Sequence, residues 1–128
     1  MLAPPRENDP VLVVQKPWID KLLDGEKTLE LRGTACRKPV NTIVYLSESG
    51  TGAIVGCARF VGCDGPLDRA TIDARFEEHR VTSDFLDAVK YNRVYGWRFV
   101  DAVRAPTPIP YAVKSGAIIW RKYTPLTL

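Results

Sequence analysis

The sequence predicts an α+β domain: a small, mostly antiparallel β-barrel with a short helix after the first strand and an inserted helical pair. Three observations support this prediction. Most apolar segments are short, rich in β-branched and aromatic residues, and bounded by Gly, Pro or Asn, as strands of small barrels are. Apolar residues at helical spacing occur in only two regions. One expected strand contains Gly56, and an interior glycine is typical of the bends at barrel corners.

The first helix is expected to run from Pro17 to Gly25. Proline suits the first helical position because its missing amide would be unpaired there in any case. Ile19, Leu22 and Leu23 recur at helical spacing, and glycine commonly follows the last helical residue. We therefore expect a helix of about two turns that docks through one apolar face.

Strands are expected in this order: Val11–Gln15, Lys27–Arg32, Thr42–Ser47, Ala53–Cys63, Val94–Val103 and Ala117–Tyr123. In the second strand, Leu29 and Leu31 alternate with polar residues and are expected to face the core. Before the last strand, Pro106, Pro108 and Pro110 predict an extended, non-helical crossing because proline lacks the amide that a helix needs.

Residues 64–91 differ in character from the flanking strands. Two short helices are expected here, the first through Ile72 and Phe76. The second should begin at Thr82 or Ser83, since either hydroxyl can accept a hydrogen bond from an unpaired backbone amide.

Length and composition indicate a single folded domain. The chain has 128 residues, 45% of them hydrophobic, which suffices for a core and excludes an intrinsically disordered chain. We expect residues 1–10 to form a flexible leader and residues 11–128 a single domain. The apolar runs are too short for a membrane span, and the N-terminus lacks a secretory signal, so no membrane partner and a cytoplasmic location are expected.

Cysteine and histidine usage argues against a metal site. Cys36, Cys57 and Cys63 contain no Cys-x-x-Cys pair, and the single histidine, His79, is distant from them in the sequence. We expect no metal and no other cofactor, and interpret the cysteines as small buried thiols. His79 is expected to be a surface residue of a helix, and a nuclease with two catalytic histidines is excluded.

The densest polar cluster spans residues 25–32. Glu30 and Arg32 should share one face of a strand because side chains two residues apart point the same way. Lys27 falls on the opposite face unless the turn after Gly25 rotates it. The simplest interpretation is a solvated strand face with an ion pair worth under about 1 kcal/mol.

This cluster resembles the signature of the ASCH domain family. A short helix that ends in Gly25 is followed by Lys27, Glu30 and Arg32 in the pattern Gly-x-Lys-x-x-Glu-x-Arg. The resemblance continues in other elements: Pro17-Trp18, Ile54-Val55-Gly56, Tyr95-Gly96-Trp97, Pro108-Ile109-Pro110-Tyr111, Gly116 and Trp120. It implies a PUA-like barrel and a cleft between barrel and helices that is lined by Lys27, Glu30 and Arg32.

The resemblance implies RNA or a modified nucleoside as the partner. Arg32 can neutralise phosphate, and a carboxylate can accept a hydrogen bond from an exocyclic amine. Trp18, Tyr95 and Trp97 are candidate stacking platforms for a base. Thr28 is a further candidate contact because it lies next to Lys27 in the sequence.

Hydrolysis is the alternative, with Lys27 and Glu30 as the catalytic candidates. Some ASCH proteins resemble amidohydrolases that deacetylate N4-acetylcytidine with a Thr, a Lys and a Glu. Lys27 matches that Lys, but Glu30 stands where the family has Thr. The family Glu would come from the helical insertion, where Glu77 and Glu78 are candidates.

Metal-independent RNA cleavage is the other enzymatic alternative that the resemblance implies. Glu30 could serve as the general base, or Lys27 if burial beside Arg32 lowers its pKa. Tyr45 or Tyr95 could assist. A protein-interaction module, in which the cluster is structural, is a third hypothesis.

The distribution of charge favours nucleic acid among these partners. The net charge is only +3. Residues 64–89 carry 3 basic and 7 acidic side chains, whereas residues 90–128 carry 7 basic and 1 acidic. A basic C-terminal segment could bind a polyanion. The Gly-containing turn at residues 47–52 resembles a phosphate loop only superficially, but its backbone amides could also border the cleft.

Overall fold

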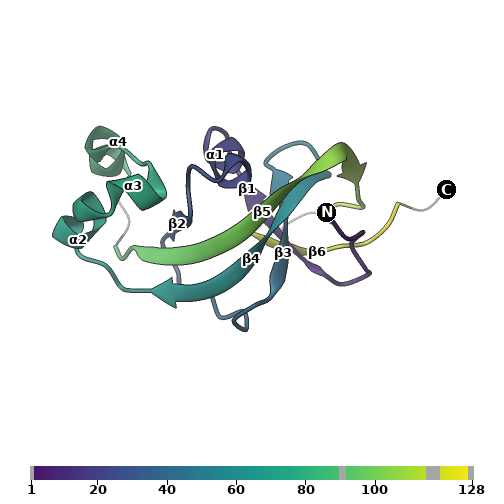
Figure 1. The fold of residues 1–128 in the computed structure, drawn as a ribbon, viewed down its shortest axis with the longest axis horizontal. Helices are drawn as coiled ribbons and strands as arrows, with labels where there is room; N and C mark the ends of the chain where they lie inside the picture. Colours follow the sequence, from purple (N-terminus) through teal and green to yellow (C-terminus); the bar gives the residue numbers. More distant parts are fainter. Residues whose placement is uncertain (1, 90–91, 115–118, 127–128) are drawn as a thin grey trace.

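The computed structural model describes residues 2–89, 92–114 and 119–126 and has an α+β fold (Figure 1). In chain order the elements are β1 (Pro10–Val14), α1 (Trp18–Asp24), β2 (Leu29–Arg32), β3 (Ile43–Glu48), β4 (Ala53–Asp64), α2 (Arg69–Ala74), α3 (Phe76–His79), α4 (Ser83–Ala88), β5 (Tyr95–Pro110) and β6 (Trp120–Lys122). Among the described residues, the strands form one six-stranded sheet in the order β2-β5-β4-β3-β1-β6.

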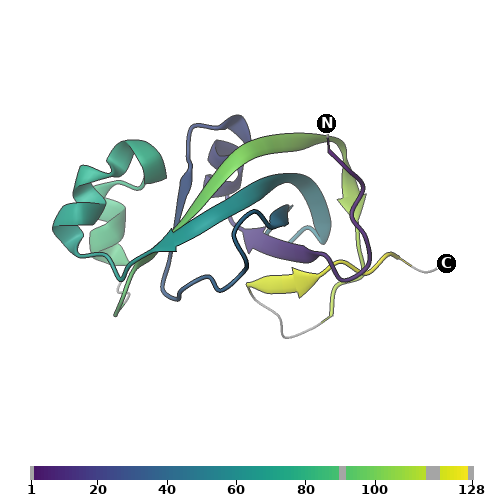
Figure 2. The ribbon, with the colours of Figure 1, turned by 60° about the horizontal axis from the view of Figure 1, so that its bottom comes forward.

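The sheet is mixed but mainly antiparallel. Among the described strands, only β1 and β3 pair in parallel, with Val11 opposite Tyr45, and the other four pairings are antiparallel. The parallel pair is possible because α1 and β2 lie between its strands in the sequence, which gives the long crossover that parallel strands need. The sheet curls strongly (Figure 2). No backbone ladder joins its two edge strands, β2 and β6, in the part of the chain that is described. The expected barrel is therefore observed as a half-barrel.

Gly56 lies where β4 bends, as its position in the sequence predicted. The register of β4 against β5 shifts between Ile54 and Gly56. A Cβ atom at Gly56 would collide with the side chain of Leu23 and the backbone carbonyl of Val103. The glycine therefore allows both α1 and β5 to approach the strand closely.

Helix α1 confirms the predicted short helix. Ile19, Leu22 and Leu23 are buried and pack into the main core. Gly25 adopts a left-handed conformation with φ 80°, and its N–H donates to the carbonyl of Leu22 at 3.2 Å. The helix consequently ends where the chain must turn into β2. In β2, Leu29 is buried as expected, whereas Leu31 is only half-buried.

The insertion between β4 and β5 contains three short helices in the described residues, so the predicted helical pair is wrong. The break falls at Arg75, whose φ and ψ of −103° and 23° lie outside the helical range. Its guanidinium bonds to Glu78 and Asp64. Arg80 ends α3 in a left-handed conformation, and the hydroxyl of Thr82 caps α4 as predicted. The three helices gather at one end of the β4–β5 arm (Figure 1).

Strand β5 is longer than predicted and includes the proline-rich segment. It pairs with β4 as far as Pro110, which lies opposite Ala53. Pro106, Pro108 and Pro110 alternate along the strand, so their nitrogens all face one side. This arrangement is tolerated because β2 pairs with β5 only up to Arg98 and leaves that edge open. The expected last strand is seen from Trp120, while its predicted start at Ala117, like Gly116 of the family signature, lies outside the described residues.

The segment before β1 lies against the sheet. The N–H of Asn8 donates to the carbonyl of Tyr123, and the Tyr45 hydroxyl donates to the carbonyl of Ala3. Cys36 and Cys57 are buried, as expected, but Cys63 is only partly so. In the described ranges, no helix has the length and apolar character needed to cross a membrane.

Candidate functional site

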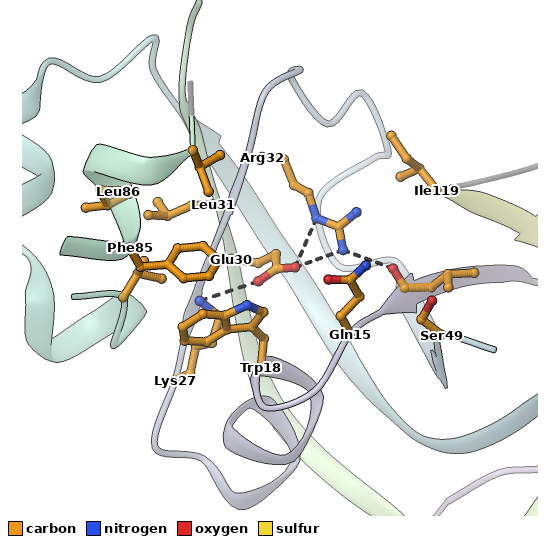
Figure 3. Close-up of a pocket in the computed structure, with 13 residues that line it drawn as sticks. Gln15, Trp18, Lys27, Glu30, Leu31, Arg32, Ser49, Phe85, Leu86 and Ile119 are labelled. Atoms are coloured by element: carbon orange, nitrogen blue, oxygen red, sulfur yellow. Dashed lines mark hydrogen bonds and ion pairs between the residues drawn. The ribbon is translucent and has the colours of Figure 1, made fainter. Parts of the chain in front are cut away.

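Lys27, Glu30 and Arg32 converge into one connected ionic group, which we call the charged triad (Figure 3). Glu30 Oε2 accepts from Arg32 Nε at 2.9 Å and lies 2.8 Å from Arg32 Nη2. Glu30 Oε1 lies 3.4 Å from Lys27 Nζ. Arg32 Nη2 also donates to the carbonyl of Val13 on β1 at 3.0 Å. Glu30 is therefore held between two cations, and one of them, Arg32, also joins β2 to β1.

The triad is buried, so the simple interpretation of a solvated strand face is wrong. Lys27 and Glu30 are 2% and 4% exposed. The side chain of Arg32 is 16% exposed and is the member that reaches solvent. Buried ions lose hydration, and a buried pair is maintained only when it is well hydrogen-bonded. Arg32 is also supported from one side by the ring of Trp97, at 5.6 Å from its centroid.

The loop between α1 and β2 rotates Lys27 toward Glu30. Its backbone N–H donates to the carbonyl of Lys21, and the next amide, that of Thr28, donates to the carbonyl of Glu78. β2 begins only at Leu29, so strand alternation does not govern Lys27. The loop is pinned between α1 and α3, and the lysine side chain points into the interior.

Lys27 is anchored to the helical insertion. Its Nζ donates to the backbone carbonyl of His79 at 2.7 Å and lies 5.1 Å from the centre of the Trp18 ring. Burial lowers the pKa of Lys27, while the neighbouring Glu30 carboxylate opposes that shift. The result is a lysine that releases its proton more readily than an exposed one.

His79 is fully buried, so its predicted position on a helix surface is wrong. Its Nδ1 accepts from the N–H of Val81 at 2.9 Å, and its Nε2 lies 2.6 Å from the carbonyl of Ile72. A carbonyl can only accept, so Nε2 carries the proton and the ring is neutral. Burial lowers the pKa of His79 and favours that neutral form. The ring thus joins α2 to the segment after α3 and fixes the carbonyl that binds Lys27.

The triad forms the polar floor of a cavity of about 330 Å³, which we call the central cavity. Its lining comes from β1, α1, β2, the turn after β3, α4 and the segment before β6: Val13, Gln15, Trp18, Lys27, Glu30, Leu31, Arg32, Ser49, Val81, Phe85, Leu86, Val89 and Ile119. Trp18 and Phe85 meet edge to face, with centroids 5.4 Å apart, and form an aromatic wall. This volume and this mixture of apolar wall and few polar groups are typical of small-ligand sites.

With this geometry in view, solved structures provide the decisive comparison. The crystal structure of ASCH from Zymomonas mobilis superimposes with a TM-score of 0.68 at 15% identity, covering 80% of this chain and 73% of that one. This chain has the ASCH fold. Two mutant structures of the same Zymomonas mobilis protein give TM-scores of 0.62 and 0.64 at 12% and 13% identity, covering 80% and 83% of this chain and 76% of each of theirs. No family model and no curated protein matches the sequence.

In this ASCH fold, four of the seven predicted site residues line the central cavity: Lys27, Glu30, Arg32 and Trp18. Thr28 does not, because it follows Lys27 on the exposed side of the chain. Tyr95 is half-buried beside Gly65, away from the lining. Both candidates were chosen from nearness in sequence or from aromatic character alone.

Trp97 lies beneath the site and not in it. It is 1% exposed, and its Nε1 donates to the carbonyl of Thr34 at 2.9 Å. Trp97 stands directly opposite Glu30 in the β2–β5 pairing and stacks on Trp120. Its observed contact with the site is therefore support of the Arg32 guanidinium.

The glutamates and tyrosines named for hydrolysis do not line the central cavity. Glu77 and Glu78 pair with Arg80 and Arg75 on the insertion, and the Tyr45 hydroxyl bonds to Ala3. Glu30 is the only carboxylate among the described lining residues. Across the described ranges, no cluster of three or more His, Cys, Asp or Glu could hold a metal ion.

Helix α4 supplies a wall that sequence analysis missed. Phe85, Leu86 and Val89 have the spacing that predicted the second helix of the insertion, yet no α4 residue is buried, and Phe85 is 46% exposed. All three line the central cavity. The signal that could have found them is the small size of the helix, which is too short to bury a separate core. Ser49, from the turn at residues 47–52, also borders the cavity, as that turn was expected to do.

Proposed function

We propose that this chain binds RNA or a nucleoside and that one base occupies the central cavity. The observation that carries the proposal is the combination of a charged floor and an aromatic wall in one cavity of about 330 Å³. A nucleobase has flat apolar faces and a polar edge, so it can use both surfaces at once.

The floor retains hydrogen-bonding capacity for a base edge. Within the described residues, Arg32 Nη1 has no hydrogen-bond partner, whereas Nε and Nη2 are occupied by Glu30 and Val13. Glu30 Oε1 receives only the long 3.4 Å contact from Lys27, and can accept from an exocyclic amine. A donor and an acceptor side by side suit the edge of cytosine or adenine.

The wall is tested by comparing two exposed phenylalanines of the insertion. Phe85 lines the cavity, and Phe76 is similarly exposed, at 38% against 46%, but does not. We expect Phe85→Ala to weaken binding of cytidine by roughly 5- to 150-fold, the range that corresponds to 1–3 kcal/mol for loss of an aromatic contact with a base. Phe76→Ala should bind as the parent does. Calorimetric titration measures both, and equal affinity of parent and Phe85→Ala would refute this placement of the base.

Hydrolysis is the second candidate function, and the buried Lys27 favours it. A lysine whose pKa is lowered by burial can exchange a proton with a substrate, and Glu30 is close enough to orient it. On N4-acetylcytidine the bond to the acetyl group would be cleaved by water to give cytidine and acetate. On RNA the 2′-hydroxyl would lose its proton and attack the adjacent phosphate, which breaks the bond to the 5′-oxygen of the next nucleotide; the products are a 2′,3′-cyclic phosphate and a protonated 5′-hydroxyl.

Turnover measured with a chelator present tests this candidate. We expect Glu30→Gln to abolish release of acetate or of RNA fragments, with Glu77→Gln as the control because Glu77 is exposed and outside the cavity. Absence of turnover by the parent on both substrates would reject hydrolysis and leave binding as the function.

A further inference from the structure

A second cavity, of about 360 Å³, is strongly basic; we call it the basic cavity. It lies between the segment leading into β1, the loop before β3, the residues that follow β5, and β6 with Thr124. Four of its lining residues are cations: Lys38, Lys114, Arg121 and Lys122. No described carboxylate lines it. Asp9 is adjacent in sequence to the lining residue Pro10, but its carboxylate accepts a hydrogen bond from the backbone N–H of Arg6 at 2.7 Å.

These four cations also lack ionic partners. Among the described residues none of them forms an ion pair, whereas most arginines elsewhere do, including Arg59 with Asp101 and Arg69 with Asp73. In addition, Arg121 Nε is buried and has no hydrogen-bond partner. A buried donor without a partner is costly and uncommon in folded proteins. An anion in the basic cavity would offset the repulsion among these like charges.

Two of the cations are held in place by the fold. Arg121 Nη1 donates to the Tyr111 hydroxyl at 2.9 Å, and that hydroxyl in turn bonds to Ser47 in the interior. Lys38 Nζ lies 4.8 Å from the centre of the Trp120 ring. Because these groups are positioned in advance, an anion would meet an ordered site and lose less affinity to side-chain ordering.

The basic cavity and the central cavity lie along the same pair of strands, β1 and β6, which run side by side in Figure 2. Val13 and Ile119 line the central cavity, and the N–H of Val13 donates to the carbonyl of Ile119. Pro10 and Lys122 line the basic cavity and are paired with each other. The two pairs lie three positions apart along the strands, or roughly 10 Å at the usual rise. An oligonucleotide can span that separation, whereas a single nucleoside cannot.

We infer that the basic cavity binds phosphates of a single-stranded RNA whose base occupies the central cavity. The inference rests on the proposed function. The described linings of the two sites differ in charge: the central cavity has two cations and one carboxylate on its floor, and the basic cavity has four cations and no carboxylate. Base recognition therefore belongs to the first site, and backbone neutralisation to the second.

Removal of two exposed cations tests the inference. We compare Lys114→Gln/Lys122→Gln with the control Arg59→Gln/Arg69→Gln, which loses the same net charge outside both cavities. The probes are hexacytidylate, measured over a salt series, and cytidine. Each lost phosphate contact should reduce the slope of log K against log salt by about 0.7, so the test variant should lose about 1.4. Its RNA affinity should fall on the order of 20-fold at 0.1 M salt, by the same relation. Cytidine binding should not change, and the control should bind RNA nearly as the parent does.

The outcomes separate the inference from the proposed function. Cytidine binding by the parent together with unchanged RNA binding by the test variant would overturn the inference alone. If the test variant loses RNA affinity as expected but the parent does not bind cytidine, the placement of the base is overturned and the phosphate site is supported. An equal loss in test and control variants would attribute RNA affinity to overall charge and overturn the inference. The inference would also be overturned if the parent bound a polyglutamate peptide of matched charge as tightly as it binds hexacytidylate. It would likewise be overturned if the parent bound inorganic phosphate but not RNA.

Discussion

The charged triad allows a quantitative prediction of folding stability. Lys27→Met preserves side-chain bulk but removes the ion pair with Glu30 and leaves the carbonyl of His79 without its donor. In this variant Glu30 still forms its ion pair with Arg32. We therefore expect the free energy of unfolding to fall by about 2–3 kcal/mol, mainly because the buried carbonyl of His79 has no donor. Glu30→Met leaves the 2% exposed Lys27 without a carboxylate, and should cost about 3–5 kcal/mol.

The double variant Lys27→Met/Glu30→Met should cost less than the sum of the two single changes. With both buried ions removed, Arg32 is the one charged member of the triad that remains. Its partly exposed guanidinium still donates a hydrogen bond to the carbonyl of Val13 and is still in contact with water. We expect a coupling energy of about 2 kcal/mol or more, because Glu30→Met alone leaves Lys27 as a buried cation without a carboxylate, and Lys27→Met removes that cation. Urea unfolding, followed by far-UV circular dichroism at neutral pH, measures the free energy of unfolding of the parent, the two single variants and the double variant.

An exposed lysine–glutamate pair of nearly the same length supplies the control. Lys21 Nζ lies 3.5 Å from Glu26, against 3.4 Å between Lys27 and Glu30, but the Lys21 and Glu26 side chains are 35% and 57% exposed. The matching cycle at Lys21 and Glu26 should give a coupling below about 1 kcal/mol. If the Lys27–Glu30 cycle is additive within about 0.5 kcal/mol, the argument that burial makes the triad interdependent is refuted.

Two further predictions concern His79 and Gly56. The pKa of His79 is lowered in the fold, so the unfolded chain binds a proton first as pH falls through about 6.5, and stability should decline by up to about 1.4 kcal/mol per pH unit until the folded pKa is reached. As His79 is the only histidine, His79→Gln should lose stability at neutral pH but show a flatter profile between about pH 7 and 5; an unchanged profile would contradict the assignment. Gly56→Ala should destabilise the fold by about 1–3 kcal/mol, because the new methyl group meets the backbone of Val103; a thermal melt within about 1 °C of the parent would show that β5 can move away.

Much of the fold could be predicted because its signals are local. Pro17 and Gly25 mark α1, and the apolar spacing between them already identifies its buried face. Helix α2 was extended too far because Ile72 and Phe76 keep helical spacing across Arg75. The guanidinium of Arg75 bonds to Asp64 on β4, and a contact between separate elements leaves no trace in local spacing.

In the candidate site, too, local patterns predicted some features, whereas contacts between separate elements decided others. Glu30 and Arg32 were placed on one face from strand alternation alone, and the ion pair between them agrees. Trp97 was offered as a platform on aromatic character, but it projects from the same face of the sheet as Glu30, its partner in the β2–β5 pairing, and the Arg32 guanidinium lies over its ring. Pairing of strands that are far apart in the sequence is a tertiary event, and no pattern within either strand encodes which side will be covered.

By itself the sequence determined the α+β class, the short helix that ends at Gly25, and the identity of the three charged residues that resemble the ASCH signature. Only the tertiary structure decided that Lys27 turns inward, since its partner is the carbonyl of His79, 52 residues further along the chain. The packing of the insertion also brings Phe85 of α4 against Trp18 to complete the aromatic wall, and it is the tertiary fold that gathers the basic side chains beside β6. The physical reason is that alternation and spacing fix directions relative to one element, whereas burial and electrostatics depend on what the rest of the chain packs against it.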